Sequence, residues 1–229
     1  MSILAIIPAR GGSKRIPRKN IKEFCGRPII EYSIQAALTA NIFTEVMVST
    51  DDTEIAEIAK NAGAKVPFLR GKETSGDFAS TADVLLEVLA MYEEEGKYFD
   101  EVCCIYPTAP FVTAQKLQKG YELMGKGNSV MPVVKYSYPI QRSICIKDEL
   151  VHMNCPQYVN TRSQELEDMY HDCGQFYFIK VDVLKEVKAL LTKKTVPYVM
   201  SDLEVQDIDH LEDWLIAEMK YRLMIGEVK

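Results

Sequence analysis

Residues 3–20 read Ile3-Leu4-Ala5-Ile6-Ile7-Pro8-Ala9-Arg10-Gly11-Gly12-Ser13-Lys14-Arg15-Ile16-Pro17-Arg18-Lys19-Asn20. The apolar run that ends at Pro8 predicts a buried first strand, and a loop with two adjacent glycines follows it directly. Six cations and no acid lie between Arg10 and Lys22, although the chain carries a net charge of −6. Backbone N–H groups at Gly11 and Gly12, beside so many cations, suit a bound triphosphate. A solvated basic loop is the alternative, and the position directly after a strand disfavours it.

Apolar runs and amphipathic stretches alternate along most of the chain. Strands are predicted at residues 3–8, 45–50, 101–106, 129–134, 174–180 and 196–200, and helices at residues 29–40, 54–62, 81–95, 114–124, 181–191 and 210–223. This order predicts an α/β fold with a mostly parallel sheet flanked by helices. In such sheets ligands bind beyond the carboxyl ends of the strands, so the residues that follow each strand are the candidates for function.

The alternation stops between Lys135 and Asp172, where no sustained helical stripe appears. Residues 143–147 and 150–153 have the pattern of a hairpin, and the rest of the segment is polar and aromatic. We interpret the segment as an insert that leaves the sheet. Its Tyr and Ile content is typical of an interface between subunits.

The composition is that of an ordinary globular protein, with 229 residues, 47% of them hydrophobic and 26% charged. The acidic net charge disfavours general nucleic-acid binding, which depends on neutralising phosphates. No apolar run approaches the length of a membrane span, and no basic leader precedes the first strand. None of the six cysteines forms a C-x-x-C pair or a zinc-type spacing. We therefore expect a cytoplasmic protein that binds neither nucleic acid nor membranes.

Two carboxylates alternate with an apolar residue near the end of the chain, in Asp207-Ile208-Asp209. In an extended segment this alternation places both carboxylates on one side and Ile208 on the other. Two carboxylates, completed by substrate phosphates, form a common Mg²⁺ site. The alternative is that Asp209 caps the helix expected from His210 onward.

Further polar residues follow other predicted strands. Asp51 and Asp52 come after one of them. Asp51 is open to two interpretations, contact with a nucleotide or closure of the turn, whereas Asp52 stands where a helix cap is expected. Thr108 and Pro110 follow another strand, and we expect them to line the pocket. His171 has no nucleophile partner for triad chemistry, and a lone His near a strand is more often structural.

The stretch from Ile7 to Asn20 resembles the CTP-binding signature of the CMP-sialic acid synthetases, the acylneuraminate cytidylyltransferases. Further matches occur in the order of that family, at Ser49-Thr50-Asp51-Asp52, at Arg70 with Asp77 and Ser80, at Pro107-Thr108-Ala109-Pro110 and at Asp207-Ile208-Asp209. The resemblance covers nearly the whole chain. It implies one Rossmann-like nucleotidyltransferase domain over residues 1–229, a homodimer, and a dimerisation insert at about residues 136–172 that reaches toward the partner's active site.

The resemblance also implies roles for single residues. CTP would be bound by Ala9, Arg10, Gly11, Gly12, Ser13, Lys19, Asn20, Arg70 and Ser80. Within this set, Arg10 and Lys19 would hold the triphosphate, and the last three residues would contact the cytidine end. Asp207 and Asp209 would bind Mg²⁺. The catalytic residues would be Arg10, Lys19, Asp207 and Asp209.

Two features are similar to the pseudaminic acid branch of the family, namely Tyr106 before Pro107-Thr108 and the sequence of residues 170–178. The resemblance then implies a sugar site made of Tyr106, Thr108, His171, Asp172 and Gln175. The expected reaction transfers CMP from CTP to the anomeric hydroxyl of a nine-carbon acidic sugar. N-acetylneuraminate, legionaminic acid and an eight-carbon ulosonate are alternative substrates. A CTP-binding regulator without catalysis is a further alternative, against which the carboxylate pair counts.

Overall fold

The computed structural model describes residues 1–71 and 79–227, so the predicted motif residue Asp77 lies outside the described residues. A seven-stranded sheet forms the centre, from β1 (Ile3–Pro8), β4 (Glu45–Ser49), β5 (Glu101–Ile105), β6 (Ser129–Lys135), β9 (Tyr170–Asp172), β10 (Phe176–Lys180) and β11 (Thr195–Met200). The helices of the described ranges are α1 (Ile29–Ala40), α2 (Thr53–Asn61), α3 (Thr81–Glu94), α4 (Ala114–Glu122), α5 (Val181–Val187) and α6 (Leu211–Met224). Two small hairpins complete the chain, β2 (Glu23–Phe24) with β3 (Arg27–Pro28), and β7 (Ile144–Lys147) with β8 (Leu150–Met153).

The strands follow the order β11-β6-β10-β5-β1-β4, with β9 paired to β6. β1 is parallel to both neighbours, so that Ile6 lies opposite Met47 on β4 and opposite Cys104 on β5. β10 is antiparallel to β5 and to β6, β9 is antiparallel to β6, and β11 is parallel to β6. Thus β4, β1, β5, β6 and β11 share one direction, and the prediction of a mostly parallel α/β sheet is confirmed.

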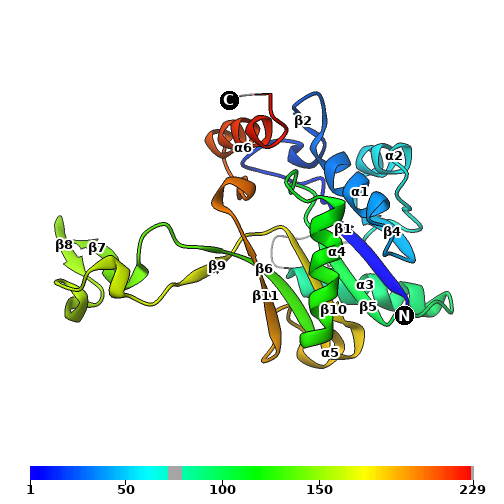
Figure 1. Ribbon diagram of the computed structural model, residues 1–229. Helices are drawn as coiled ribbons and strands as arrows, with labels where there is room; N and C mark the ends of the chain where they lie inside the picture. The colour runs from blue at the N-terminus through cyan, green and yellow to red at the C-terminus, as the bar shows by residue number, and fades with distance from the viewer. Residues whose placement is uncertain (72–78, 228–229) are drawn as a thin grey trace.

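Helices cover both faces of the sheet because the strand residues alternate between two apolar cores (Figure 1). On one face, Ala5 and Ile7 of β1 pack with residues of α1, α2 and α4. On the other face, Leu4 and Ile6 pack with residues of α3 and α5. A strand that is buried on both faces reads as a continuous apolar run, which is the pattern at the start of the chain.

A third core lies beyond the sheet and is built around α6. Ile16 of the loop after β1 and Ile208 of the segment before α6 are both buried there, together with Trp214. This packing joins two segments that are far apart in the sequence. α6 was expected to be amphipathic, but apolar residues also lie on its exposed side, where Leu215 is 60% and Met219 71% exposed.

The predicted insert leaves the sheet as an arm, which we define as residues 136–169 (Figure 1). Its tip is the hairpin of β7 and β8, as the sequence predicts. The return segment, residues 170–172, belongs to the sheet as β9, so the arm is shorter than the predicted span of 136–172. The root of the arm is closed by a hydrogen bond of 2.9 Å from the Tyr136 N–H to the Met169 carbonyl oxygen.

The predicted helices and strands are present, with shifts at their ends. α4 stops at Glu122, because Leu123–Lys126 tightens into a 3-10 turn. α5 stops at Val187, since Lys188 adopts the left-handed conformation, with φ 50°. Among the residues that the structure describes, no helix combines the length and the apolar character needed to cross a membrane.

Candidate active site

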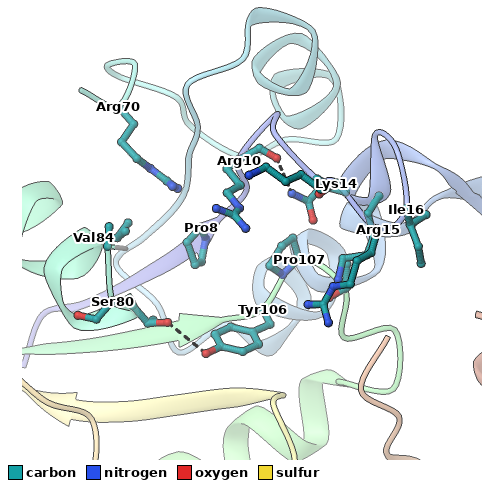
Figure 2. Close-up of a pocket in the computed structure, with 16 residues that line it drawn as sticks. Pro8, Arg10, Lys14, Arg15, Ile16, Arg70, Ser80, Val84, Tyr106 and Pro107 are labelled. Atoms are coloured by element: carbon teal, nitrogen blue, oxygen red, sulfur yellow. Dashed lines mark hydrogen bonds between the residues drawn. The ribbon is translucent and has the colours of Figure 1, made fainter. Parts of the chain in front are cut away.

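A cavity of about 450 Å³ opens at the carboxyl ends of β1 and β5, the edge at which open α/β sheets bind ligands. The described residues that line it are Pro8, Arg10, Ser13, Lys14, Arg15, Ile16, Lys19, Asn20, Arg70, Ala79, Ser80, Thr81, Val84, Tyr106, Pro107 and Thr108. Figure 2 shows Arg10 and Arg70 directed toward the same space, with Tyr106 on its other side. The cavity is therefore cationic on one side and aromatic on the other.

Hydrogen bonds at both ends hold the loop after β1 in shape. Asn20, which is buried, donates from Nδ2 to the carbonyl oxygen of Arg10 at 2.9 Å. The N–H of Gly11 donates to Oδ1 of Asp51, also at 2.9 Å. Asp51 therefore joins the turn after β4 to the loop after β1.

Arg70 contributes a buried positive charge to the cavity. It is 9% exposed, and its guanidinium donates to both the side chain and the carbonyl oxygen of Ser49, with 3.1 Å between Nε and Oγ. Burial lowers the pKa of Arg70, and Asp51 opposes that effect. Because arginine keeps its proton even when it is buried, Arg70 stays positively charged in the cavity.

Lys19 lies where the basic loop meets the acidic segment, by which we mean residues 207–209. Its Nζ donates to the carbonyl oxygen of Ile208 at 2.5 Å and lies 3.8 Å from Oδ1 of Asp209. Arg15 reaches the same Oδ1, at 2.6 Å from Nη2. Burial lowers the pKa of Lys19, and the two carboxylates of the acidic segment partly offset that effect. Two oppositely charged segments thus meet beside the cavity.

Asp207 and Asp209 flank the buried Ile208, so the alternation expected from the sequence is present. The alternative role of Asp209 as a helix cap is wrong. His210 is the N-cap residue of α6, and Oδ2 of Asp213 in the first turn accepts the N–H groups of Asp209 and His210, at 2.9 and 2.7 Å. The carboxylate of Asp209 is therefore left to face the basic loop.

The acidic segment suits a hard divalent cation. Desolvation raises the pKa of Asp207, and the negative charge of Asp209 raises it further. A cation between the two carboxylates would relieve both effects, and carboxylate oxygens are ligands that Mg²⁺ accepts. Within residues 1–71 and 79–227, no group of three or more His, Cys, Asp or Glu side chains is arranged to hold a metal ion. Two carboxylates fit a metal whose other ligands are substrate phosphates and water.

Tyr106 forms the aromatic wall of the cavity. Its hydroxyl lies 3.1 Å from Oγ1 of Thr81 at the start of α3. Its ring packs on that of Tyr177, with 5.4 Å between the centroids, and its carbonyl oxygen accepts a hydrogen bond of 2.7 Å from Ser33. The Tyr106 side chain is therefore held at its hydroxyl and at its ring, its backbone is anchored by Ser33, and the ring offers the cavity an apolar surface.

Comparison with known proteins agrees with this geometry. Residues 4–196 match the model of a family described as cytidylyltransferase. This chain belongs to the cytidylyltransferase family. It is 39% identical to a pseudaminic acid cytidylyltransferase of Campylobacter jejuni subsp. jejuni, with 97% of each chain covered. It is 32% identical to a CMP-N,N'-diacetyllegionaminic acid synthase of Legionella pneumophila, with 95% of each chain covered.

The fold agrees with the family as well. A solved structure of CMP:2-keto-3-deoxy-manno-octonic acid synthetase complexed with CTP superposes with a TM-score of 0.71 over the full length of both chains. The identity between the two is 17%, so this likeness shows the fold alone. It confirms the prediction of a nucleotidyltransferase fold.

Most of the CTP residues expected for this cytidylyltransferase line one cavity. They are Arg10, Ser13, Lys19, Asn20, Arg70 and Ser80. Ala9 differs, because it is fully buried at the end of β1 and its N–H donates to the carbonyl oxygen of Ser49 at 2.8 Å. Gly11 and Gly12 lie in the loop next to the lining residues, where only their backbone is available to a ligand.

The residues expected at the sugar are divided between two places. Tyr106 and Thr108 line the cavity, whereas His171 and Asp172 belong to β9 and are not among its described lining residues. The ring of His171 packs on Tyr136 at the root of the arm, with 4.6 Å between the centroids. The carboxylate of Asp172 accepts hydrogen bonds from the hydroxyl of Tyr177 at 2.7 and 2.8 Å.

The prediction that Gln175 belongs to the sugar site is not supported, because its side chain is fully buried and is not part of the described lining of the cavity. The peptide before β10 continues the pairing with β5, as the hydrogen bond of 2.9 Å from the Tyr106 N–H to the Gln175 carbonyl oxygen shows. That register turns the side chain of Gln175 into the protein, where its Nε2 donates to the Cys173 carbonyl oxygen at 3.3 Å.

Sequence reasoning missed two residues that shape the site of this cytidylyltransferase. Thr81 was overlooked, although Ser80 and Asp83 form a capping box that fixes the start of α3. The sequence singles out residues 170–178 as a whole and does not separate Tyr177 from the neighbouring aromatics. Strand alternation separates it from Phe176 and Phe178, and its ring packs on that of Tyr106.

Proposed function

We propose that this cytidylyltransferase transfers CMP from CTP to the anomeric hydroxyl of a nine-carbon acidic sugar, and that the sugar is pseudaminic acid. The proposal rests on one cavity in which the cationic loop after β1 and the Tyr106 wall face each other, with the acidic segment beside Lys19. The cations that line this cavity suit both a triphosphate and a sugar carboxylate. The C. jejuni relative, similar over 97% of both chains, supports the choice of sugar.

The reaction forms one P–O bond and breaks another. The anomeric oxygen attacks the α-phosphorus of CTP, the bond to the bridging oxygen of the β-phosphate breaks, and pyrophosphate leaves while the hydroxyl proton passes to solvent. Arg10 and Lys19 hold the phosphates and offset the charge that develops on them. Asn20, Arg70 and Ser80 hold the cytidine end, so that the α-phosphate is presented in line to the sugar.

Mg²⁺ is the cation proposed for the acidic segment. When bound, it would supply positive charge to the phosphates and order them for displacement. The contribution of the chain itself is to hold Asp207 and Asp209 beside the basic loop, through the burial of Ile208 and the contact of Arg15 with Asp209 at 2.6 Å.

The choice of pseudaminic acid has a physical reason in the Tyr106 wall. Pseudaminic acid ends in a methyl group and carries a second acylamino group, whereas N-acetylneuraminate carries more hydroxyls. The hydroxyl of Tyr106 is engaged by Thr81, so its ring is the part that meets the sugar. A sugar hydroxyl buried against such a surface without a partner costs about 1–3 kcal/mol.

The test is kcat/KM for a panel of acidic sugars with wild type, Tyr106→Gln and Tyr106→Phe. We expect pseudaminic acid to be the best substrate and Tyr106→Gln to reduce its advantage over N-acetylneuraminate about tenfold, because the amide gives a hydroxyl a partner. Tyr106→Phe is the matched control, since it keeps the ring and loses only the contact with Thr81. Equal use of the two sugars by wild type would refute the substrate while leaving the reaction in place.

Legionaminic acid is the second candidate, favoured by the relative in L. pneumophila that is 32% identical. The same panel decides between the two, and it includes an eight-carbon ulosonate. If CTP binds but no sugar releases pyrophosphate, the chain is a CTP-binding regulator and the enzymatic proposal fails.

The proposal includes a homodimer held by the arm, and a cytoplasmic location, because CTP is an intracellular metabolite. The hairpin of β7 and β8 is a two-stranded sheet that stands away from the rest of the chain (Figure 1). Such a sheet is marginally stable by itself. Ile146 and Val151 lie directly opposite each other on it and are 74% and 64% exposed, which supports burial against a second copy.

A further inference from the structure

Arg18 and Lys19 are neighbours in the basic loop but contact different parts of the molecule. Lys19 reaches the acidic segment beside the cavity, with its Nζ 2.5 Å from the Ile208 carbonyl oxygen. Arg18 instead contacts Asp52 and Glu54 at the start of α2, and it is not among the described residues that line the cavity. One of the six cations that suggested a triphosphate site is thus occupied by two carboxylates.

The contact between Arg18 and Asp52 is a two-pronged ion pair. Nη1 donates to Oδ2 of Asp52, and Nη2 donates to Oδ1 at 3.1 Å and also to Glu54. Arg18 has φ 56°, a left-handed conformation that a residue with a side chain adopts only where its surroundings hold it. Lys19–Ile21 then forms a short 3-10 turn directly after this residue. The ion pair therefore fixes the backbone from which Lys19 projects.

The start of α2 also contacts the other end of the loop. Oδ2 of Asp52 lies so near Gly11 that a Cβ on this glycine would be 2.6 Å from it. The adjacent Asp51 accepts the N–H of Gly11 at 2.9 Å. Asp52 itself is held by α2, because its Oδ1 accepts the N–H groups of Glu54 and Ile55 at 3.0 and 3.1 Å. Both ends of the basic loop are thus tied to one rigid helix end.

We propose that Arg18 and Asp52 are positioning residues that hold the loop after β1 in the conformation that binds the triphosphate, without touching the nucleotide themselves. The inference rests on the proposed function only in taking CTP as the ligand. Holding a loop in its bound conformation raises affinity, because the ordering no longer has to occur on binding.

Removal of the Asp52 charge separates this role from simple electrostatics. Asp52 is an acid beside a phosphate site, so a purely electrostatic view predicts that Asp52→Asn binds CTP more tightly. The positioning role predicts weaker binding, since an amide loses the charged pairing with Arg18. Asn is also a good helix cap, so α2 should remain intact.

The experiment measures the dissociation constants of CTP and of cytidine by calorimetry for wild type, Asp52→Asn, Arg18→Gln and the double variant. We expect the dissociation constant of CTP to rise about tenfold in each single variant. A rise of this size corresponds to a loop that is in the binding conformation in only about one-tenth of the molecules. The constant for cytidine should rise less than that for CTP, because Arg70 and Ser80 lie outside the loop, and an unchanged unfolding midpoint shows that the variants are folded. The double variant should bind CTP no worse than either single one, because both remove the same ion pair.

Lys60→Gln is the control, since Lys60 is an exposed cation near the far end of α2 and its loss changes the net charge as Arg18→Gln does. We expect CTP binding by this variant to stay within about twofold of wild type, because an exposed charge is screened. Tighter or unchanged CTP binding by Asp52→Asn would overturn the inference, and so would effects of the two single variants that simply add. If wild type itself does not bind CTP, the proposed function fails and the inference fails with it. If wild type binds CTP but Asp52→Asn binds it equally well, only the inference fails.

Discussion

Arg15, Arg18 and Lys19 of the basic loop lie in different surroundings, and these surroundings limit what each side chain can do. Arg15 pairs with Asp209, and Arg18 pairs with Asp52 and Glu54. Lys19 keeps its ammonium group near the cavity, where a phosphate can reach it. A count of charges in the loop therefore overestimates the number available to CTP.

Replacement of Arg10 or Lys19 by Ala should weaken the binding of CTP far more than that of cytidine. Both residues line the cavity on the side of the basic loop, and a charge-assisted hydrogen bond to a phosphate oxygen is stronger than a neutral one. We expect an increase of about ten- to a hundredfold in the dissociation constant of CTP for each variant. Calorimetry with both ligands checks this, and equal losses for CTP and cytidine would show that neither residue touches the triphosphate.

Asp207→Asn or Asp209→Asn should lower kcat about a hundred- to a thousandfold, the usual scale for the loss of one charge stabiliser. The fold should survive, because His210 rather than Asp209 is the N-cap residue of α6. The measurement is pyrophosphate release at limiting and at saturating Mg²⁺. Asp202→Asn is the control, as it removes a carboxylate from the nearby 3-10 turn at Asp202–Glu204. A variant of Asp207 or Asp209 that keeps wild-type turnover at limiting Mg²⁺ would exclude that residue as a ligand.

At the scale of elements, the start of α2 couples the stability of a helix to the shape of a loop. The hydrogen bond from Arg18 holds the pKa of Asp52 below its ordinary value of 3.8, and the N–H groups of Ile55 and Glu54 add to this effect while burial opposes it. A carboxyl whose pKa is lower in the folded chain stabilises the fold above its unfolded pKa. That stabilisation is lost as the pH falls through the folded pKa.

The free energy of unfolding of the wild type should therefore decrease more steeply below about pH 4 than that of Asp52→Asn, which has no carboxyl to titrate at this position. Urea denaturation at several pH values between about 7 and 3 measures both slopes. Arg18→Gln should give an intermediate slope, because the N–H groups of α2 still hold the carboxylate. Identical slopes for wild type and Asp52→Asn would show that the ion pair does not contribute to stability.

At the scale of the whole molecule, the arm decides the oligomeric state that we propose. Ile146→Asp or Val151→Asp places a charge on the exposed apolar face of the hairpin, so the burial of that face against a second copy becomes unfavourable. We expect a dimer for wild type and a monomer for either variant in analytical ultracentrifugation. Lys147→Glu is the control. Lys147 follows Ile146 in β7 and already carries an exposed charge, so this variant should leave the dimer intact. A monomeric wild type with full activity would refute the proposal.

The sequence by itself determined the features that depend on local spacing. The elements were predictable because apolar residues repeat with the period of a strand or a helix, and the hairpin at residues 144–153 and the alternation around Ile208 were predictable for the same reason. The basic loop is predicted to bind phosphates from its composition and its place after β1, and this role stays a prediction. The family followed from motifs in their order along the chain.

Only the tertiary structure decided which of these features meet. The contact between the loops of Ile16 and Ile208 arises in the third core, where two distant segments bury apolar side chains together. The pairing of Arg18 with Asp52 and the burial of Gln175 likewise depend on neighbours from other parts of the chain. Periodicity shows which side of an element is apolar. It does not show what covers that side, because packing of distant surfaces is governed by the shape of the whole core rather than by local sequence.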